Sequence, residues 1–511
     1  MKPGGWIECQ NRFNGAWSFA IWDDRLQQLF LSRDRIGEKP LFYTYWNDTL
    51  VFASEIKAIE KYGVPLEPRP ELLELYLFFT NIPGPDTFYK DIFKLKPGHY
   101  LLYKNGKYSE HQYWDLPYTE EGRMLKNTKQ VYEEFEYLFR DAVKLQMRSD
   151  VPYGAFLSGG LDSSSIVALM AEQSSFPIET FTIGFEDKAF DESALAQLVA
   201  NKFNTNHHLA TVEPEKFSES LRKTIYHCDE PFGDSSAIPT SYVSKYASEN
   251  VKMVLTGDGG DEVLSGYNSY LGLKILDIYN KIPSIITNSS LRLVKTISPM
   301  FKGNIRYTLN KMESIAEAAK MPFNERMIHK MAYADYAVIK SLVKNIDTIP
   351  VEEYYGNLMK QCPFQDEFYK LMYFDFKHSL PDDYLVKVDR MSMANSLEAR
   401  IPFLDYRLVE FMAGVDKNVK MQGFESKSVL RKTIGKQLPK GILNAPKRGF
   451  GIPLREWFKD DSFDSNLNGL YQDNYYLDTN VVKEIVKMNK SGEKDYGNFI
   501  WTMSVLQNIM N

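Results

Sequence analysis

The sequence predicts an α/β protein with three successive parts: a β-rich N-terminal part, a parallel-sheet part and a helical C-terminal part. Short hydrophobic segments bounded by turn residues fill about the first 115 residues. Strand-like and helix-like segments then alternate from about residue 131 to about residue 256, and helix-like sequence follows. Such alternation is typical of βαβ units, which assemble into a parallel sheet with helices on its faces.

Paired strands are expected in the N-terminal part because turn residues separate its apolar runs. The dipeptide Asn105-Gly106 is a strong hairpin signal, and Asn47-Asp48 is a weaker one. We therefore expect strand pairs over residues 17–22 and 29–32, 41–45 and 50–54, and 99–103 and 107–113, with a short helix over residues 71–79.

A polar stretch between residues 117 and 130 lacks hydrophobic periodicity and is interpreted as a linker. It divides the chain into a first domain over residues 1–116 and a second domain over residues 131–511. The second domain opens with an amphipathic helix from Val131. Beyond it, strands are expected over residues 153–157, 180–185, 208–212 and 251–256, and helices over residues 163–172, 192–203 and 241–249.

Composition excludes several classes of protein. The 511 residues carry a net charge of −6 without long charged blocks, which argues against a nucleic-acid partner. The three cysteines are isolated, so neither a disulfide framework nor a zinc ribbon is expected. No apolar stretch is long enough to span a membrane, and no signal peptide is recognised at the N-terminus. We expect a cytoplasmic protein that acts on small molecules.

The segment Ser158-Gly159-Gly160-Leu161-Asp162-Ser163-Ser164 lies between a predicted strand and a predicted helix. Its glycines allow close approach of the backbone, and the helix N-terminus offers N–H groups and a positive dipole end to phosphates. A carboxylate inside an anion site calls for a cation, so Mg²⁺ is the expected partner of Asp162. The alternative is a tight turn with an Asp/Ser helix cap.

A second glycine-rich segment, Thr256-Gly257-Asp258-Gly259-Gly260-Asp261-Glu262, follows the last predicted strand. The carboxyl ends of parallel strands meet at one sheet edge, where ligands bind in open α/β sheets. We expect Asp261 to join Asp162 around the metal. A solvated acidic turn is the competing interpretation.

Two further segments carry charged residues in patterns typical of functional sites. Arg390, Glu398, Arg400 and Asp405 interleave with apolar residues and either line a site or connect helices through ion pairs. Lys447 and Arg448 lie in a loop rich in Gly and Pro that either closes over phosphates or forms an exposed basic turn.

These four segments, in this order, resemble the synthetase domain of glutamine-dependent asparagine synthetases, and the first resembles the pyrophosphate loop of AMP-forming enzymes. The segments over residues 12–23 and 33–43 resemble the second half of the glutaminase domain of that family. The resemblance implies an αββα domain of the N-terminal nucleophile (Ntn) type, followed by a synthetase domain like that of the adenine-nucleotide α-hydrolases.

The resemblance also implies a reaction. ATP adenylates the side-chain carboxylate of aspartate, pyrophosphate leaves, and ammonia attacks to give asparagine and AMP. ATP would be bound by Leu157, Ser158, Gly159, Gly160, Asp162, Ser163, Ser164, Ile183, Thr256 and Gly257. Asp162 and Asp261 would hold Mg²⁺, and Asp258, Glu398 and Lys447 would be catalytic. The substrate would contact Asp261, Glu262 and Arg400.

The N-terminus departs from the family pattern. A glutaminase of this class needs a cysteine directly after the initiator Met, whereas residue 2 is Lys and Cys9 is internal. As written, the chain is expected to lack glutaminase activity and to use free ammonia or a separate glutaminase chain. Half of such a domain would also expose strand edges and an apolar face. A homodimer is a further expected assembly.

Two alternatives stay open. Relatives of this family amidate other carboxylates, including uronic acids of surface polysaccharides, and the variant Gly257-Asp258-Gly259-Gly260-Asp261 keeps this alternative open. The other alternative is a non-catalytic ATP-binding remnant. A tRNA-modifying enzyme is disfavoured, because basic patches and zinc-type cysteines are lacking.

Overall fold

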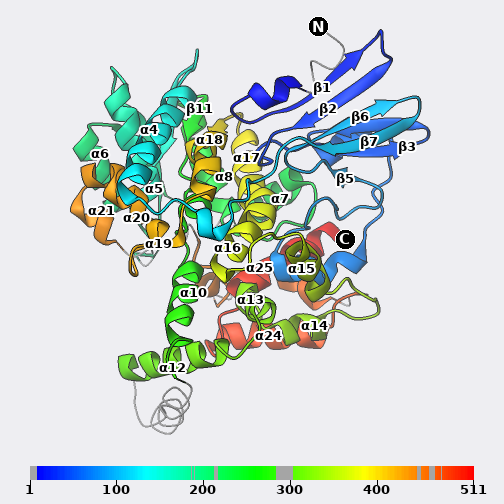
Figure 1. Ribbon diagram of the computed structural model, residues 1–511. Coiled ribbons are helices and arrows are strands. Elements are labelled where there is room, and N and C mark those ends of the chain that lie inside the picture. The colour runs from blue at the N-terminus through cyan, green and yellow to red at the C-terminus, as the bar shows by residue number, and fades with distance from the viewer. Residues whose placement is uncertain are drawn as a thin grey trace.

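The computed structural model describes residues 8–185, 187–188, 190–211, 217–283, 303–445, 451–459, 467–472 and 475–510. Figure 1 shows the β-rich N-terminal part beside a larger α/β and helical body. The N-terminal part holds two antiparallel sheets, with strand orders β1-β2-β6-β7 and β4-β3-β5. Its elements are β1 (Ser18–Asp23), β2 (Gln28–Arg33), β3 (Phe42–Trp46), β4 (Thr49–Ala53), α2 (Ile56–Tyr62), α3 (Leu73–Phe79), β5 (Phe93–Lys94), β6 (His99–Lys104) and β7 (Lys107–Gln112).

The three predicted hairpins are confirmed, and local turn chemistry explains them. Asn47 and Asp48 both adopt positive φ, as do Asn105 and Gly106. Two-residue turns of this kind match the twist of the strands that they join. A small apolar core formed by Leu31, Leu41, Tyr43, Leu50, Leu95 and Leu101 lies between the sheets. Within the described ranges, β1 lies at the edge of its sheet, and the side chain of Trp22 on this strand is 52% exposed.

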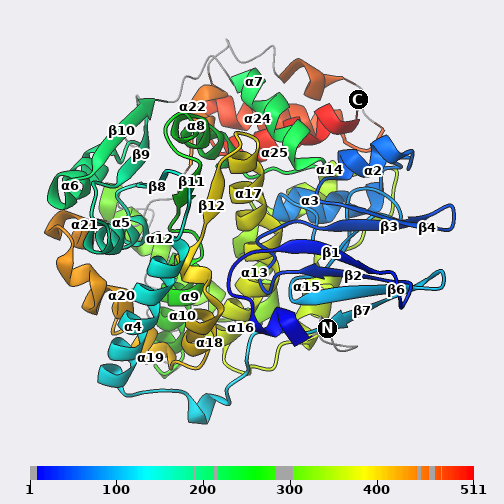
Figure 2. The same ribbon diagram turned by 90° about the horizontal axis from the view of Figure 1, so that it is seen from above.

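A five-stranded parallel sheet forms the centre of the larger body, in the order β10-β9-β8-β11-β12. Figure 2 shows α5 and α6 on one side of this sheet and α8 and α17 on the other. The elements are α4 (Thr128–Gln146), β8 (Tyr153–Phe156), α5 (Leu161–Gln173), β9 (Glu179–Gly184), α6 (Ser193–Phe203), β10 (Asn206–Thr211), α7 (Phe217–Cys228), α8 (Ala237–Ser248), β11 (Met253–Leu255), α9 (Gly260–Leu264), α17 (Leu385–Met393) and β12 (Glu398–Arg400).

The remaining described residues are mainly helical, as predicted. A π-helical segment over Asp375–Tyr384 leads directly into α17. The other helices are α10 (Asn268–Tyr279), α12 (Gly303–Ala318), α13 (Phe323–Met331), α14 (Tyr336–Leu342), α15 (Val351–Lys360), α16 (Glu367–Phe374), α18 (Tyr406–Ala413), α19 (Lys417–Lys420), α20 (Ser428–Lys432), α21 (Lys440–Asn444), α22 (Leu454–Trp457), α24 (Thr479–Ser491) and α25 (Gly497–Met510). None of the helices within the described ranges is long and apolar enough to cross a membrane.

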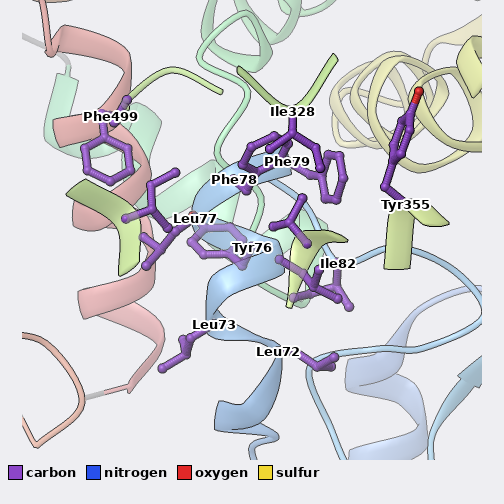
Figure 3. Close-up of a cluster of buried hydrophobic side chains, with 14 of the residues drawn as sticks. Leu72, Leu73, Tyr76, Leu77, Phe78, Phe79, Ile82, Ile328, Tyr355 and Phe499 are labelled. Atoms are coloured by element: carbon purple, nitrogen blue, oxygen red, sulfur yellow. The ribbon is translucent and has the colours of Figure 1, made fainter. Parts of the chain in front are cut away.

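Helix α3 of the N-terminal part is embedded in the C-terminal helices. Figure 3 shows its apolar side chains against Ile328, Tyr355 and Phe499, and all of these residues belong to one buried cluster. The Tyr76 hydroxyl donates a hydrogen bond to the Thr502 carbonyl at 2.9 Å. The N-terminal part and the C-terminal helices therefore share a core.

Charged contacts also attach the N-terminal part to α17 and to the segment before α8. Lys39 pairs with Asp389 at 2.7 Å, and Lys94 pairs with Glu230 at 2.8 Å. The second pair is almost fully buried, so removing either partner would leave a costly unpaired charge. These contacts fix the position of elements that line the pocket described below.

Element boundaries differ from the predictions at two informative places. Helix α4 begins at Thr128, within the predicted linker, because the Asn127 side chain accepts a hydrogen bond from the Gln130 N–H and caps the helix. Helix α5 begins at Leu161, so Asp162 lies in its first turn, where the helix dipole favours a carboxylate.

His378 should make stability depend on acid pH. It lies among Phe79, Phe374 and Tyr354, and burial followed by the Lys94 ammonium lowers the pKa of His378 to about 3. The unfolded chain protonates its imidazole near pH 6.5, so stability is full above that pH and is lost as pH falls toward 3.

His378→Gln should remove this dependence, because Gln does not titrate. The stability difference between wild type and variant should change by about 1.4 kcal/mol per pH unit between pH 6 and pH 4. Urea unfolding at several pH values measures it. Parallel pH profiles for the two proteins would contradict the assignment.

Candidate active site

A pocket of about 500 Å³ opens at the carboxyl ends of β8, β9 and β11. The two glycine-rich segments both border it, which is the arrangement expected for an open α/β sheet. Of the residues predicted from the sequence, those that line the pocket are Leu157, Ser158, Gly159, Gly160, Asp162, Ser163, Ile183, Thr256, Gly257, Asp258, Asp261 and Glu262.

The first segment forms a tight loop that has no room for a side chain at Gly159. Gly159 has a φ of +79°, and a Cβ there would lie 2.7 Å from the Ala196 backbone nitrogen. The Gly160 N–H donates to the Ser158 hydroxyl oxygen at 3.2 Å, and the Ser158 and Ser163 hydroxyls are 3.0 Å apart. The loop therefore directs hydroxyls and the N-terminus of α5 toward the pocket, as a phosphate site requires. Ser164 does not line the pocket, because it is fully buried in α5.

The second segment packs directly on the first. A Cβ on Gly257 would lie 2.8 Å from the Ser163 backbone nitrogen, and a Cβ on Gly260 would lie 2.9 Å from Asp162 Oδ1. Both glycines are therefore needed for the two loops to touch. The Thr256 hydroxyl donates a hydrogen bond to Asp258, which orients this carboxylate at the pocket wall.

Lys427 joins the two segments, although no sequence pattern marks it as a site residue. Its ammonium pairs with Asp162 and, at 2.7 Å, with Asp261 Oδ1. The Lys427 side chain is only 6% exposed. Burial alone would lower the pKa of Lys427, but the carboxylates of Asp162 and Asp261 outweigh it and raise that pKa, so the side chain is charged.

Two features of the backbone hold Lys427 in this position. Lys427 itself has a left-handed conformation, with φ of 52°, which is unfavourable for a residue with a side chain and is often found at functional sites. A Cβ on Gly266 would lie 2.0 Å from both the Lys427 Cε and Asp261 Oδ1, so only glycine fits beneath this side chain.

The donor atoms at this position fit a magnesium ion bound together with phosphates. The carboxylates of Asp162 and Asp261 both pair with the ammonium of Lys427. Carboxylate oxygens are also ligands that Mg²⁺ prefers. Within the described ranges, no group of three or more His, Cys, Asp and Glu side chains is arranged to hold a metal ion. Phosphate oxygens would therefore have to complete the coordination of the ion.

Glu262 is buried beside this centre and is neutral at moderate pH. The Tyr267 hydroxyl donates a hydrogen bond to Glu262 Oε1. Burial, followed by the neighbouring Asp261 carboxylate, raises the pKa of Glu262 to about 8. A protonated Glu262 adds no negative charge where phosphates would bind.

Two of the predicted site residues, Glu398 and Arg400, do not line the pocket. They lie on β12, where Arg400 Nε pairs with Glu398 Oε1 at 2.7 Å and its Nη1 donates to the backbone carbonyls of Gln146 and Arg148. Strand β12 runs parallel to β11, and Glu398 is paired with Met253 at the first residue of β11. The second segment follows the other end of β11, so Glu398 lies away from it. The Arg400 carbonyl accepts a hydrogen bond from the Thr256 N–H at 2.9 Å and so supports the second segment.

Arg390 and Asp405 likewise connect elements. Arg390 donates to the Ser54 carbonyl at 2.8 Å, and Asp405 caps α18 and pairs with Arg407. Arg390 therefore links α17 to the N-terminal part, whereas the ion pair of Asp405 lies within the first turn of α18. Lys447 and Arg448 lie outside the described residues.

Comparisons with known proteins match both parts of the chain. The family model "Asparagine synthase" matches residues 134–511, and the model "Glutamine amidotransferase domain" matches residues 2–114. An asparagine synthetase [glutamine-hydrolyzing] 1 of Bacillus subtilis is 29% identical over 98% of this chain and 77% of its own length. A Methanocaldococcus jannaschii protein, provisionally named asparagine synthetase [glutamine-hydrolyzing] 2, is 34% identical over 78% of this chain and 76% of its own length. An amidase of Gibberella zeae is 24% identical over 88% of this chain and 71% of its own length.

Lys427→Met should strongly destabilise the protein, because it leaves two carboxylates without their shared ammonium. Removing one partner of a buried ion pair costs about 3–5 kcal/mol, and urea unfolding without nucleotide measures this loss. Lys432→Met is a matched control, since Lys432 lies in α20, which begins directly after Lys427, and pairs with Glu425 at the surface, at 3.2 Å. That variant should lose less than about 1 kcal/mol. Equal losses in the two variants would contradict a central role for Lys427.

Proposed function

Because the chain belongs to the asparagine synthase family of carbon–nitrogen ligases, we propose that it adenylates the side-chain carboxylate of aspartate and forms asparagine with ammonia. The family uses ATP for amide formation. One observation supports this proposal most directly. Asp162 and Asp261 both pair with the ammonium of Lys427, next to the glycine-rich loop at the N-terminus of α5.

The proposed nucleotide site uses the strand ends and the two segments. Leu157, Ile183 and Thr256 border the part of the pocket in which the nucleotide would lie. The Ser158–Gly160 loop and the first turn of α5 would receive the β- and γ-phosphates. Asp162 and Asp261 would hold Mg²⁺, which would neutralise phosphate charge when bound. In the same proposal, Lys427 would then contact phosphate oxygens, since a lysine ammonium can donate up to three hydrogen bonds.

The reaction proceeds in two steps. A carboxylate oxygen of aspartate attacks the α-phosphorus of ATP, and the bond to the bridging oxygen breaks to release pyrophosphate. Ammonia then attacks the acyl carbon, and AMP leaves with the oxygen that came from the carboxylate. Asp258 lies at the pocket wall, where it would accept a proton from the attacking ammonia. Lys447 would stabilise the charge that develops on the phosphates in the first step.

The second candidate is amidation of a different carboxylate. It is favoured by the variant segment Gly257-Asp258-Gly259-Gly260-Asp261 at the pocket wall. Both candidates share the adenylation step and differ only in the acceptor, so a substrate panel separates them. A non-catalytic remnant would bind ATP but would form no AMP with any carboxylate.

Purified protein with Mg²⁺, ATP, ammonium and aspartate should release pyrophosphate together with an equal amount of asparagine and AMP. The control omits aspartate and should give only background release. Release that depends on a uronic acid instead of aspartate would support the second candidate. Absence of AMP with every carboxylate tested would contradict the proposed function.

Asp162→Asn should lower AMP formation by at least about a hundredfold, because it removes a charge next to the phosphates without changing side-chain size. Asp277→Asn is a suitable control, since Asp277 is half exposed and pairs with Lys417 away from the pocket. Circular dichroism checks that both variants stay folded. Near-normal turnover in the Asp162 variant would contradict the metal and phosphate assignment.

A further inference from the structure

The end of the pocket away from the first segment carries an unusual combination of charges. It is lined by Asp234 from the turn before α8, Asp383 and Tyr384 from the π-helical segment, Lys387 from α17 and Tyr333. We call these five residues the acceptor subsite. None of them was singled out as a site residue from the sequence.

Lys387 is the cationic group of the acceptor subsite. It is 9% exposed, and its ammonium lies 3.4 Å from Asp234 Oδ2. That distance is longer than an ordinary N–H···O hydrogen bond, so the ammonium retains donors for a ligand. Burial alone would lower the pKa of Lys387, but the carboxylates of Asp234, Asp258 and Asp383 raise it, so the group stays charged.

Asp383 is a buried acidic group of the acceptor subsite. Its Oδ1 is buried and has no hydrogen-bond partner among the described residues. Burial, followed by the Asp234 carboxylate, raises the pKa of Asp383 well above its ordinary value. Asp234 is already satisfied, because its Oδ1 accepts hydrogen bonds from the Ser236 N–H and hydroxyl. Among the described residues of the acceptor subsite, Asp383 Oδ1 is therefore a buried acceptor that a ligand can engage.

This end of the pocket thus offers one ammonium and an excess of carboxylates. The ammonium of Lys387 is surrounded by three carboxylates, those of Asp234, Asp258 and Asp383. A substrate that brings only a further carboxylate would increase the repulsion between these negative groups. A substrate that also carries an ammonium would reduce it, because a charged donor would reach Asp383. A uronic acid has hydroxyl groups but no cationic group and cannot provide this compensation.

We propose that the acceptor subsite selects an amino-bearing carboxylate, with the substrate ammonium on Asp383 and its non-reacting carboxylate on Lys387. This inference rests on the proposed adenylation and deepens it, since it specifies how the acceptor is recognised. The reacting carboxylate would then extend toward Asp258 and the nucleotide end of the pocket.

Equilibrium binding tests the subsite separately from catalysis. Calorimetric titrations use the protein with Mg²⁺ and α,β-methylene-ATP, which does not release pyrophosphate, and compare L-aspartate, succinate and D-galacturonate. Succinate differs from aspartate by the amine alone. Aspartate should bind at least about tenfold more tightly than succinate or galacturonate, as expected for a buried charge-assisted hydrogen bond.

Asp383→Asn should raise the Kd for aspartate by about tenfold or more, leave the Kd for the nucleotide analogue within about twofold, and leave the Kd for succinate equal or lower, because one repelling carboxylate is removed. Asp382→Asn is the matched control. Asp382 is the adjacent buried carboxylate, but it accepts a hydrogen bond from the Gly84 N–H at 2.9 Å, which Asn can also accept. This control should bind aspartate as the wild type does.

The proposal is overturned if aspartate does not bind, if succinate or galacturonate binds as tightly as aspartate, or if Asp383→Asn binds aspartate like the wild type. Failure of the proposed function gives a different result. In that case aspartate binding would show the expected preference, but ATP would yield no AMP with any carboxylate.

Discussion

The ion pairs of Lys427 with Asp162 and Asp261 are the interaction on which the candidate site depends. Each carboxylate comes from a different glycine-rich segment, and the lysine comes from a third part of the chain, at the start of α20. Two carboxylates this close would repel each other without a cation between them. The shared ammonium therefore holds the two strand-end segments together and defines where a further cation and phosphates would lie.

The rest of the fold keeps this centre in place. Glycines at positions 257, 260 and 266 allow the segments and the lysine to approach to distances that no side chain would permit. Strand β12 supports the second segment through the Arg400 carbonyl. The N-terminal part contributes from the other side, because Lys39 and Lys94 pair with residues of α17 and of the segment before α8. A site built on such packed elements is preorganised, which favours stabilisation of developing charge.

Local signals explain what could be predicted from the sequence. Hairpins at Asn47-Asp48 and Asn105-Gly106 depend on turn residues alone, and the loop before α5 has its own glycines and hydroxyls. Lys427 had no such signal, since its partner Asp162 is 265 positions away. Strand β12 has only three residues, too few for a pattern, so the sequence did not reveal that Glu398 and Arg400 lie on one strand and pair with each other. The burial of α3 among C-terminal helices is likewise a long-range contact.

The central claim is that a substrate carboxylate attacks the α-phosphorus of ATP, and isotope transfer tests this most directly. Aspartate labelled with ¹⁸O in its side-chain carboxylate is incubated with the protein, Mg²⁺, ATP and ammonium, and the AMP is analysed by mass spectrometry. The account predicts AMP that carries one ¹⁸O atom, because the oxygen that attacks phosphorus leaves with AMP when ammonia forms the amide. Unlabelled AMP, or formation of ADP and phosphate in place of AMP and pyrophosphate, would contradict it.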